Sequence, residues 1–289
     1  MHYEGNIIRP PSEANSIILQ VSVGCSHNKC TFCGAYKGVR FRIKDDFTIK
    51  EDISFAAKYC RQQKRVFIGD GDALIIPTGR LTDIFLSIRE NLPWVNRISL
   101  YGNAKSILRK NIEELVKLKE LGLDRIYMGL ESGHPPTLKK IRKGVTAEQM
   151  IAAAGMVREA GVFLSVTVLL GIAGINDSEI HASESGRILT EMKPNQIAAL
   201  TLMLLENTPL HEDAVSGSFH LPDQKMLLTE LRTMVNCINL ERVQFQANHA
   251  SNYLPISGRL MKDKKKILQI IEDGLAGRKY LKAESQRGL

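Results

Sequence analysis

The sequence lacks long apolar segments, and none of its hydrophobic runs reaches the roughly 20 residues that a membrane-spanning helix needs. The first residues show no basic stretch followed by an apolar core, so no secretory signal is expected. Cysteine is scarce and odd in number, with five residues in 289, which disfavours a disulfide framework. Two of the five, Cys60 and Cys237, fall in expected helices and are interpreted as packing residues. These absences predict a soluble protein of the reducing cytoplasm, with no membrane contact.

Basic residues outnumber acidic ones: 39 lysines and arginines stand against 31 aspartates and glutamates, a formal net charge of +8. The excess is spread along the chain, apart from a lysine-rich run at 262–266 inside an expected helix. Nucleic acid and an acidic electron carrier are two candidate partners, and a solvated basic surface is the simplest explanation.

Six apolar segments alternate with amphipathic ones along the first two thirds of the chain. The apolar segments show no period-two alternation, which is typical of strands buried on both faces of a parallel sheet. Right-handed crossovers would curl six such units into an α/β fold, an open (β/α)6 partial TIM barrel. In such barrels the functional residues lie at the carboxyl ends of the strands. The expected strands are 17–23, 65–69, 97–101, 125–130, 163–170 and 196–202.

Two helix starts and a domain boundary are also predicted. Thr48 with Glu51, and Thr146 with Gln149, have the spacing of capping boxes. After residue 205 the strand–helix alternation ends and the pattern becomes mostly helical. We therefore divide the chain into a barrel core with its lead-in, 1–205, and an extension packed on the barrel, 206–289, which is too short for an independent large domain.

Three cysteines, Cys25, Cys30 and Cys33, fall within nine residues directly after the first expected strand. Thiolates are the usual protein ligands of iron–sulfur clusters. Three thiolates on a [4Fe–4S] cluster would leave one iron open to a substrate or cofactor. Zinc bound by the same cysteines and His27 is the alternative, but the spacing lacks the paired C-x2-C knuckles of most structural zinc sites. The spacing therefore favours an iron–sulfur cluster.

The cysteine stretch resembles the motif of the radical S-adenosylmethionine (SAM) superfamily, C-x3-C-x2-C with an aromatic residue before the last cysteine. Phe32 takes the aromatic place, and the first gap is one residue longer, giving C-x4-C-x2-C. The resemblance extends over roughly residues 16–205. Within it, the run Gly-Leu-Glu-Ser-Gly at 129–133 and the residues after it look like the coproporphyrinogen-oxidase-like, anaerobic cyclase-like branch.

The resemblance implies that SAM contacts the ends of several strands. The turn after the second strand matches the Gly-rich turn whose backbone binds the SAM amino group, and glycine allows such close approach. The polar pair after the fourth strand matches residues that contact the ribose or carboxylate of SAM. The Gly-x-x-Gly turn after the fifth strand would help to bind the adenine. The side-chain amide of Asn103, after the third strand, would face the same end of the barrel. The residues implied are Gly69, Asp70, Gly71, Asp72, Asn103, Glu131, Ser132, Gly171 and Gly174.

The implied cofactors are a [4Fe–4S] cluster and SAM, and the implied reaction is reductive cleavage of SAM to a 5′-deoxyadenosyl radical that abstracts hydrogen from a substrate. Reduced flavodoxin or ferredoxin would supply the electron, docking near Lys37, Arg40 and Arg42. A small-molecule substrate is favoured over nucleic acid because no separate RNA-binding module is visible. Three alternatives stay open: a 3-amino-3-carboxypropyl radical, an RNA-modifying enzyme, and a non-catalytic zinc- or cluster-binding interaction protein.

One polar, aromatic group lies outside the strand–helix repeat. It comprises Asn248, His249, Asn252 and Tyr253. These residues either line a substrate pocket or form a satisfied network within a loop.

Overall fold

The computed structural model describes residues 1–288, which form two compact units. The first unit comprises Met1–Asn28, Ala35–Met128 and Ala152–Leu164, and the second comprises Lys29–Gly34, Gly129–Ile151 and the chain from Ser165 on. Strands β6 (Leu123–Glu131) and β7 (Phe163–Leu170) and helix α6 (Ala147–Glu159) each contribute residues to both units. None of the helices within the described residues is long and apolar enough to cross a membrane.

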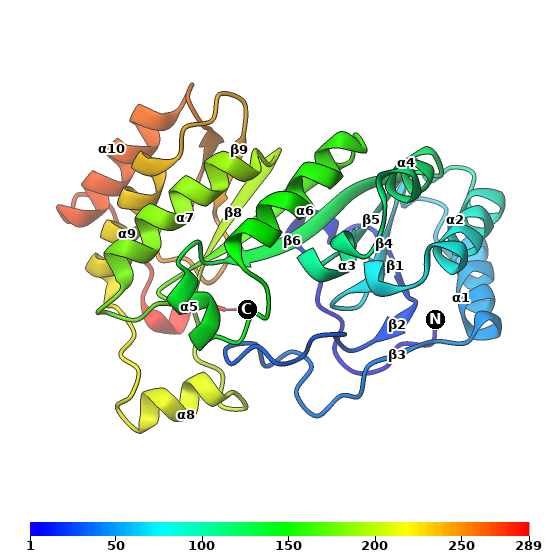
Figure 1. Ribbon diagram of the computed structural model, residues 1–289, viewed down its shortest axis with the longest axis horizontal. Coiled ribbons are helices and arrows are strands. Elements are labelled where there is room, and N and C mark those ends of the chain that lie inside the picture. The colour runs from blue at the N-terminus through cyan, green and yellow to red at the C-terminus, as the bar shows by residue number, and fades with distance from the viewer. Residues whose placement is uncertain (289) are drawn as a thin grey trace. The chain divides into compact units, whose positions relative to one another are not determined.

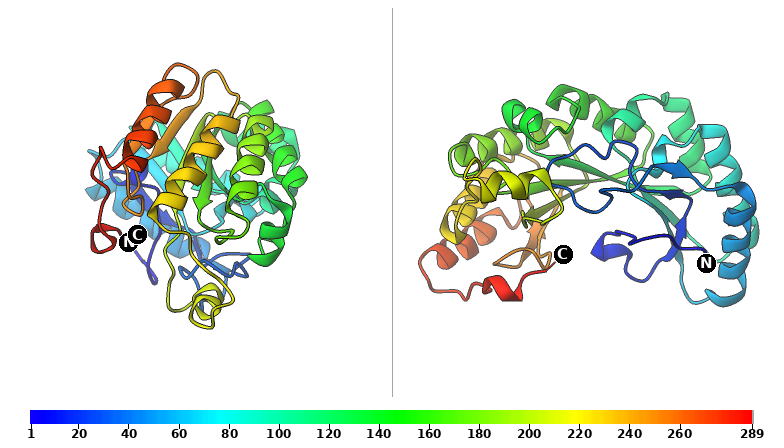
Figure 2. Two further views of the ribbon diagram at one scale, coloured as in Figure 1. Left: turned by 90° about the vertical axis from the view of Figure 1, so that its left-hand side faces the viewer. Right: turned by 90° about the horizontal axis from the view of Figure 1, so that it is seen from below.

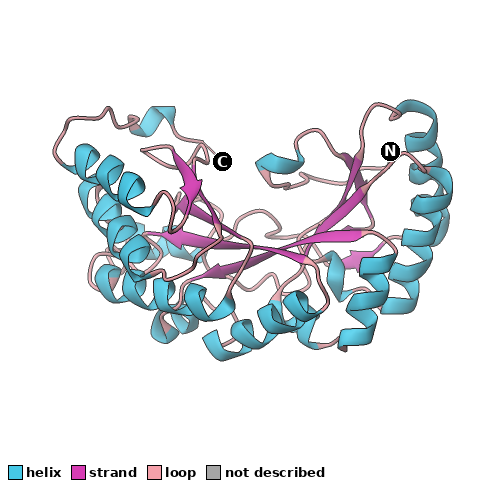
Figure 3. Ribbon diagram, turned by 90° about the horizontal axis from the view of Figure 1, so that it is seen from above, coloured by secondary structure: helices cyan, strands magenta, loops and turns pink. Residues whose placement is uncertain are grey.

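The first unit is built on parallel strands in the order β1, β4, β5 and β6 (Figure 1). A short antiparallel pair, β2 with β3, flanks the cysteine loop. In Figure 3 the long helices of this unit run along one face of its strands. The elements are β1 (Ile17–Gln20), β2 (Ser22–Val23), β3 (Arg42–Ile43), α1 (Asp46–Tyr59), β4 (Arg65–Gly69), α2 (Thr78–Asn91), β5 (Arg97–Tyr101), α3 (Ala104–Leu108) and α4 (Ile112–Glu120).

The second unit continues from β7 to two parallel neighbours, β8 and β9, and ends on β10, which is antiparallel to β9. Helix α9 contacts both α7 and α10, and Figure 2 shows it in yellow between them. The elements are α5 (Pro135–Lys140), α7 (Ser178–Met192), β8 (Gln196–Thr201), α8 (Pro209–Val215), α9 (Gln224–Cys237), β9 (Gln244–Ala247), β10 (Ile256–Arg259) and α10 (Lys264–Leu275).

The predicted α/β class with six buried parallel strands is confirmed. In β4, Val66, Phe67 and Ile68 are all fully buried, as expected for a strand covered on both faces. Besides helices, the region after residue 205 contains two strands, β9 and β10, which the sequence analysis did not predict. Each is a four-residue segment with glutamine, or with glycine and arginine, and such segments give too weak a hydrophobic pattern to be recognised. The boundary predicted at residue 205 stays a prediction.

One predicted helix start is confirmed and another is wrong. Thr146 and Gln149 exchange hydrogen bonds as a capping box, with distances of 3.3 and 3.0 Å. Helix α1, however, begins two residues before Thr48, because the Asp45 carboxylate accepts the Thr48 N–H at 2.8 Å and acts as the N-cap.

The lead-in to β1 is fixed by a buried carboxylate, Glu13, and this predicts acid sensitivity. Glu13 is fully buried, pairs with Arg97 at 2.9 Å and accepts hydrogen bonds from Tyr127 (2.6 Å) and Ser16 (2.5 Å). Burial alone would raise the pKa of Glu13, but these hydrogen bonds and the Arg97 charge lower it below its ordinary value of 4.5. The stabilisation by Glu13 is therefore complete above pH 4.5 and is lost as pH falls through the lower folded-state pKa.

We expect Glu13→Gln to lower the free energy of unfolding by about 2 kcal/mol at neutral pH. The difference from the natural protein should shrink below pH 4.5, and urea unfolding at several pH values measures it. The exposed residue Glu120 supplies the control, since Glu120→Gln should leave the pH profile unchanged. A deficit in Glu13→Gln that stays constant with pH would contradict the role given to the ionised carboxylate.

Candidate functional site

Cys25, in the first unit, lies close against the turn that follows β4. The Gly71 N–H donates to the Gly24 carbonyl at 3.2 Å. A Cβ placed on Gly71 would lie 3.0 Å from the Cys25 Cβ and 2.7 Å from the Tyr36 ring. The contact with Tyr36 is shorter than real Cβ atoms show and the contact with the Cys25 Cβ is unusually tight, so glycine suits this close approach of the two segments.

Asp70, next in this turn, is almost fully buried and binds the cysteine loop. Its carboxylate accepts hydrogen bonds from the Gln20 side chain (3.0 Å), the Gly24 N–H (3.2 Å) and the Tyr36 hydroxyl (2.9 Å). Burial raises the pKa of Asp70, and these three donors oppose the rise. Burial and the neighbouring carboxylate also raise the pKa of Tyr36.

Asp72 is fully buried and is the centre of a second set of hydrogen bonds. Its carboxylate accepts from the Asn103 side chain (2.6 Å), the Asn103 N–H (3.2 Å), the Ser106 hydroxyl (2.6 Å) and the Ser26 hydroxyl. Burial raises the pKa of Asp72, and hydrogen bonds from the two serines and Asn103 oppose the rise. Asn103 also caps α3, its side chain accepting the Ser106 N–H at 2.9 Å.

The first unit thus brings together Cys25, the turn 69–72 and Asn103, all of which the sequence singles out. Contact of any of them with SAM stays a prediction. Sequence reasoning missed Gln20, Ser26 and Tyr36, which bind the two aspartates, because their spacing carries no recognisable pattern.

Cys30 and Cys33 lie in the second unit, in a segment anchored through its backbone. The Thr31 N–H donates to the Ile141 carbonyl at 3.0 Å, and the Thr31 carbonyl accepts the Leu210 N–H at 3.0 Å. The side chain of Asn207 donates to the Gly34 carbonyl at 2.9 Å. The segment is therefore fixed between the end of α5 and the start of α8.

Ser132 and Glu131, after β6, have different surroundings. Ser132 is fully buried, its hydroxyl 2.7 Å from His181 Nδ1, and it accepts the His134 N–H at 3.0 Å. Glu131 has a positive φ of 62° and pairs with Lys143 at 2.8 Å. The structure places both residues at the end of β6, as predicted, while their contact with SAM stays a prediction.

Gly171 and Gly174 form the turn after β7, and both have positive φ, 83° and 74°. The Gly174 N–H donates to the Gly171 carbonyl at 3.1 Å. The Gly171 N–H donates to the buried carboxylate of Glu230 on α9 at 2.7 Å, and Ser178 donates to the same carboxylate. The Glu230 carboxylate also lies 3.3 Å from Nε2 of His181, the residue that contacts Ser132, but no hydrogen bond joins these two atoms.

A cavity of about 270 Å³ lies beside this turn. It is close in size to the smaller ligand pockets of proteins, which start near about 300 Å³. A salt bridge between Lys140 and Asp177, 2.9 Å long, supplies part of its polar wall, and the hydrogen bond from Lys140 lowers the pKa of Asp177. Other lining residues are Thr31, Ile141, Ile172, Ala173, Gly174, Leu210, Phe219 and His220.

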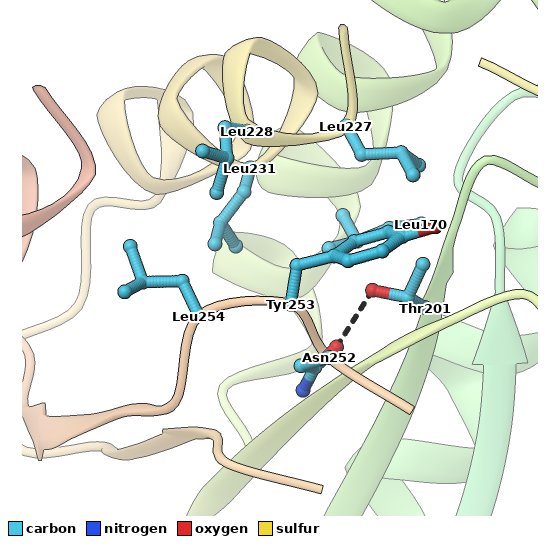
Figure 4. A pocket seen from close by; sticks show the side chains of 8 residues that line it. All are labelled: Leu170, Thr201, Leu227, Leu228, Leu231, Asn252, Tyr253 and Leu254. Atoms are coloured by element: carbon cyan, nitrogen blue, oxygen red, sulfur yellow. Dashed lines mark hydrogen bonds between the residues drawn. The ribbon is translucent and has the colours of Figure 1, made fainter. Parts of the chain in front are cut away.

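Three members of the polar, aromatic group after β9, namely His249, Asn252 and Tyr253, make side-chain hydrogen bonds within the protein, while a role of the group in substrate binding stays a prediction. Asn252 accepts from the Thr201 hydroxyl and donates to the Ala199 carbonyl, both at 2.8 Å (Figure 4). Tyr253 bonds Glu284 and Arg287, and His249 lies 2.9 Å from the Ser251 hydroxyl. The adjoining pocket has a volume of only about 10 Å³, room for about one water molecule.

The donor chemistry of the cysteines suits an iron–sulfur cluster. All three are partly exposed, and no disulfide joins any of the five cysteines. Cys25 belongs to the first unit and the other two to the second, and within residues 1–288 no three His, Cys, Asp or Glu side chains are gathered as a metal site. The partly exposed Cys25 thiol beside a glycine turn, and the two further partly exposed thiols, nonetheless have the donor chemistry of a thiolate-bound cluster.

Residues 19–184, more than half of the chain, match the Radical SAM superfamily. The chain is 25% identical over 206 residues to 4′-phospho-dehydrooxetanocin synthase of Priestia megaterium, covering 64% of this chain and 28% of that protein. It is 29% identical over 157 residues to GTP 3′,8-cyclase of Listeria monocytogenes, covering 53% of this chain and 44% of the cyclase. It thus spans less than half the length of either relative.

Among solved structures, coproporphyrinogen III oxidase (HemN) from Escherichia coli superimposes with a TM-score of 0.55. The match covers 77% of this chain and 53% of that one at 14% identity, which shows a shared fold. The superfamily and the partial-barrel fold predicted from the sequence are both confirmed. The chain belongs to the Radical SAM superfamily, whose members are enzymes.

Proposed function

We propose that this chain binds a [4Fe–4S] cluster through Cys25, Cys30 and Cys33 and uses it to cleave SAM reductively. The observation that carries the proposal is the three-thiol motif within a chain that matches the superfamily from residue 19 to residue 184. The partial exposure of each thiol and the reducing cytoplasm in which we place the protein both suit thiolate ligands.

When bound, the cluster supplies the electron that breaks a carbon–sulfur bond of SAM and yields a 5′-deoxyadenosyl radical. The proposed role of the protein's own residues is to hold SAM in position beside the cluster. Gly71, in the turn 69–72, lies against Cys25, so an amino group bound by the backbone of this turn would be next to one proposed cluster ligand. Glu131 and Ser132, at the end of β6, are the proposed contacts for the ribose or carboxylate of SAM.

The cavity beside Gly174 is the proposed seat of the adenine. Its floor is the turn after β7, and Thr31, next to Cys30, forms another wall. Apolar side chains such as Ile141, Leu210 and Phe219 line it together with polar groups, as suits the faces and edge of a nucleobase.

Filling this cavity is expected to weaken SAM binding. In Ala173→Leu the larger side chain should occupy space that the adenine needs, raising the dissociation constant by about tenfold. Equilibrium dialysis of SAM against reconstituted protein measures the effect. The control is Ala276→Leu, an exposed position outside the cavity. Equal affinity in Ala173→Leu and the control would place the adenine elsewhere.

The proposed electron donor is an acidic carrier such as reduced flavodoxin or ferredoxin, and the proposed substrate is a small molecule. Lys37, Arg40 and Arg42 follow the cysteines closely, although Arg42 is already paired with Glu4. One relative is named for a reaction on GTP, a small molecule, which supports that substrate class.

Anaerobic reconstitution with iron and sulfide tests the proposal. The loaded protein should contain about four iron atoms per chain and show broad visible absorption. It should form 5′-deoxyadenosine from SAM once dithionite is added. Replacing dithionite with reduced flavodoxin at low and high salt tests the donor, since screening should slow an electrostatic encounter. Bound zinc without iron, or SAM left intact by an iron-loaded chain, would overturn the proposed function.

A further inference from the structure

We propose that Asp70 and Asp72 are positioning residues for Cys25, and that they anchor the backbone on both sides of this cysteine to the end of β4. The inference rests on the proposed role of Cys25 as a cluster ligand. It assigns the two aspartate side chains to the protein's own loop, and leaves the backbone of the turn for SAM.

Asp70 anchors the residue before Cys25. One carboxylate oxygen accepts the Gly24 N–H at 3.2 Å and the Gln20 side chain at 3.0 Å, and the other accepts the Tyr36 hydroxyl at 2.9 Å. Gln20 ends β1 and Tyr36 lies beyond the last cysteine, so one buried carboxylate joins the start and the end of the cysteine loop to β4. A buried carboxylate with three donors is costly to move, because any donor it loses would leave its charge less well compensated.

Asp72 anchors the residue after Cys25. The Ser26 hydroxyl donates to Asp72 Oδ2, the same oxygen that accepts the Ser106 hydroxyl at 2.6 Å and the Asn103 side chain at 2.6 Å. Ser26 is exposed, whereas Asp72 is fully buried and fixed from the α3 side by Asn103 and Ser106. The bond from Ser26 therefore ties an exposed loop residue to a rigid buried group.

Gly71, between the two aspartates, contacts the cysteine loop directly. Its backbone N–H bonds the Gly24 carbonyl, and its missing side chain lets Cys25 approach. The three consecutive residues thus contact Gly24, Cys25 and Ser26 in turn. A ligand held in place before its metal arrives loses less conformational freedom on binding, which favours retention of the cluster.

Two serine variants separate this role from general stability. Ser26→Ala removes the donor on the Cys25 side of Asp72, and Ser106→Ala removes a donor to the same oxygen on the α3 side. The cluster-free chain is treated anaerobically with iodoacetamide, and the alkylation of each cysteine is followed by peptide mass spectrometry with the exposed Cys237 as internal reference. Iron loss to a chelator is then measured on the reconstituted chain.

We expect Cys25 in Ser26→Ala to be alkylated about fivefold faster than in the natural chain, since a hydrogen bond to a charged group is lost. Ser106→Ala should raise the Cys25 rate much less, because Asn103 still holds Asp72 by two hydrogen bonds, and Ser26→Thr, which keeps the hydroxyl, should restore the natural rate. Iron should leave Ser26→Ala faster than Ser106→Ala. Equal Cys25 rates in Ser26→Ala and Ser106→Ala would overturn the inference. A natural chain that binds no iron would overturn the proposed function instead, because the alkylation measurement does not need the cluster.

Discussion

Replacing Cys30 with alanine should leave a folded chain that no longer holds iron. Two thiolates cannot retain a cluster built for three, so the iron content after reconstitution should fall from about four atoms per chain to well under one. Formation of 5′-deoxyadenosine should fall with it. Cys25→Ala and Cys33→Ala should behave in the same way, because each removes one of the three proposed ligands.

The fold should survive the Cys30 change because the segment is held by its backbone. Thr31 bonds the Ile141 carbonyl and the Leu210 N–H, and Gly34 accepts from Asn207, none of which involves a thiol. Cys237 is exposed on α9, so its interpretation as a packing residue is wrong, and since it lies in no cysteine motif, Cys237→Ala is the matched control. Urea unfolding should show the two variants equally stable without metal. Full iron content in Cys30→Ala would contradict the ligand assignment.

The parts of this protein that depend on short-range pattern were predictable from the sequence. Continuous apolar segments such as 65–69 and 163–170 identified the parallel strands, because a strand buried on both faces needs apolar residues at every position. The three cysteines were identified by their spacing, and the turn after β7 by its resemblance to a Gly-x-x-Gly turn, both of whose glycines have positive φ in the structure. In each case the information lies within a few neighbouring residues.

Long-range polar contacts were not predictable in this way. The bond between Ser26 and Asp72 joins residues 46 apart, and that between Gly171 and Glu230 joins residues 59 apart. Nothing in either local sequence marks its partner. The N-cap of α1 was predicted wrongly for a related reason. Asp45 and Thr48 are both good N-cap residues, and which of them begins the helix depends on the path of the chain after β3.

The second large effect that we expect is a loss of stability on replacing Glu230. It lies on α9 among Leu227, Leu231 and Met234, so the helix presents a carboxylate from its buried face. A buried carboxyl group is stable only where hydrogen bonds satisfy its oxygen atoms. Here the donors are the Gly171 N–H and the Ser178 hydroxyl, with His181 Nε2 3.3 Å away.

We therefore expect Glu230→Ala to lower the free energy of unfolding by about 3 kcal/mol, because the Gly171 N–H and the Ser178 hydroxyl lose their buried acceptor and the missing side chain leaves a cavity. Glu230→Gln should lose less, because its amide oxygen can still accept from Gly171. The control is Glu272→Ala, which removes an exposed partner of Arg232 from the contact between α9 and α10 and should cost under about 1 kcal/mol. Urea unfolding of the full chain measures all three.

The same variants separate stability from ligand binding. If Glu230 fixes the turn after β7, Glu230→Ala should weaken SAM binding even where urea unfolding shows the chain still folded, because the Gly171 turn borders the proposed adenine cavity. Glu230→Gln, which keeps an acceptor for the Gly171 N–H, should bind SAM more tightly than Glu230→Ala. Glu272→Ala should bind SAM normally. Should Glu230→Ala unfold at the same urea concentration as Glu272→Ala, the carboxylate would not be stabilising this turn.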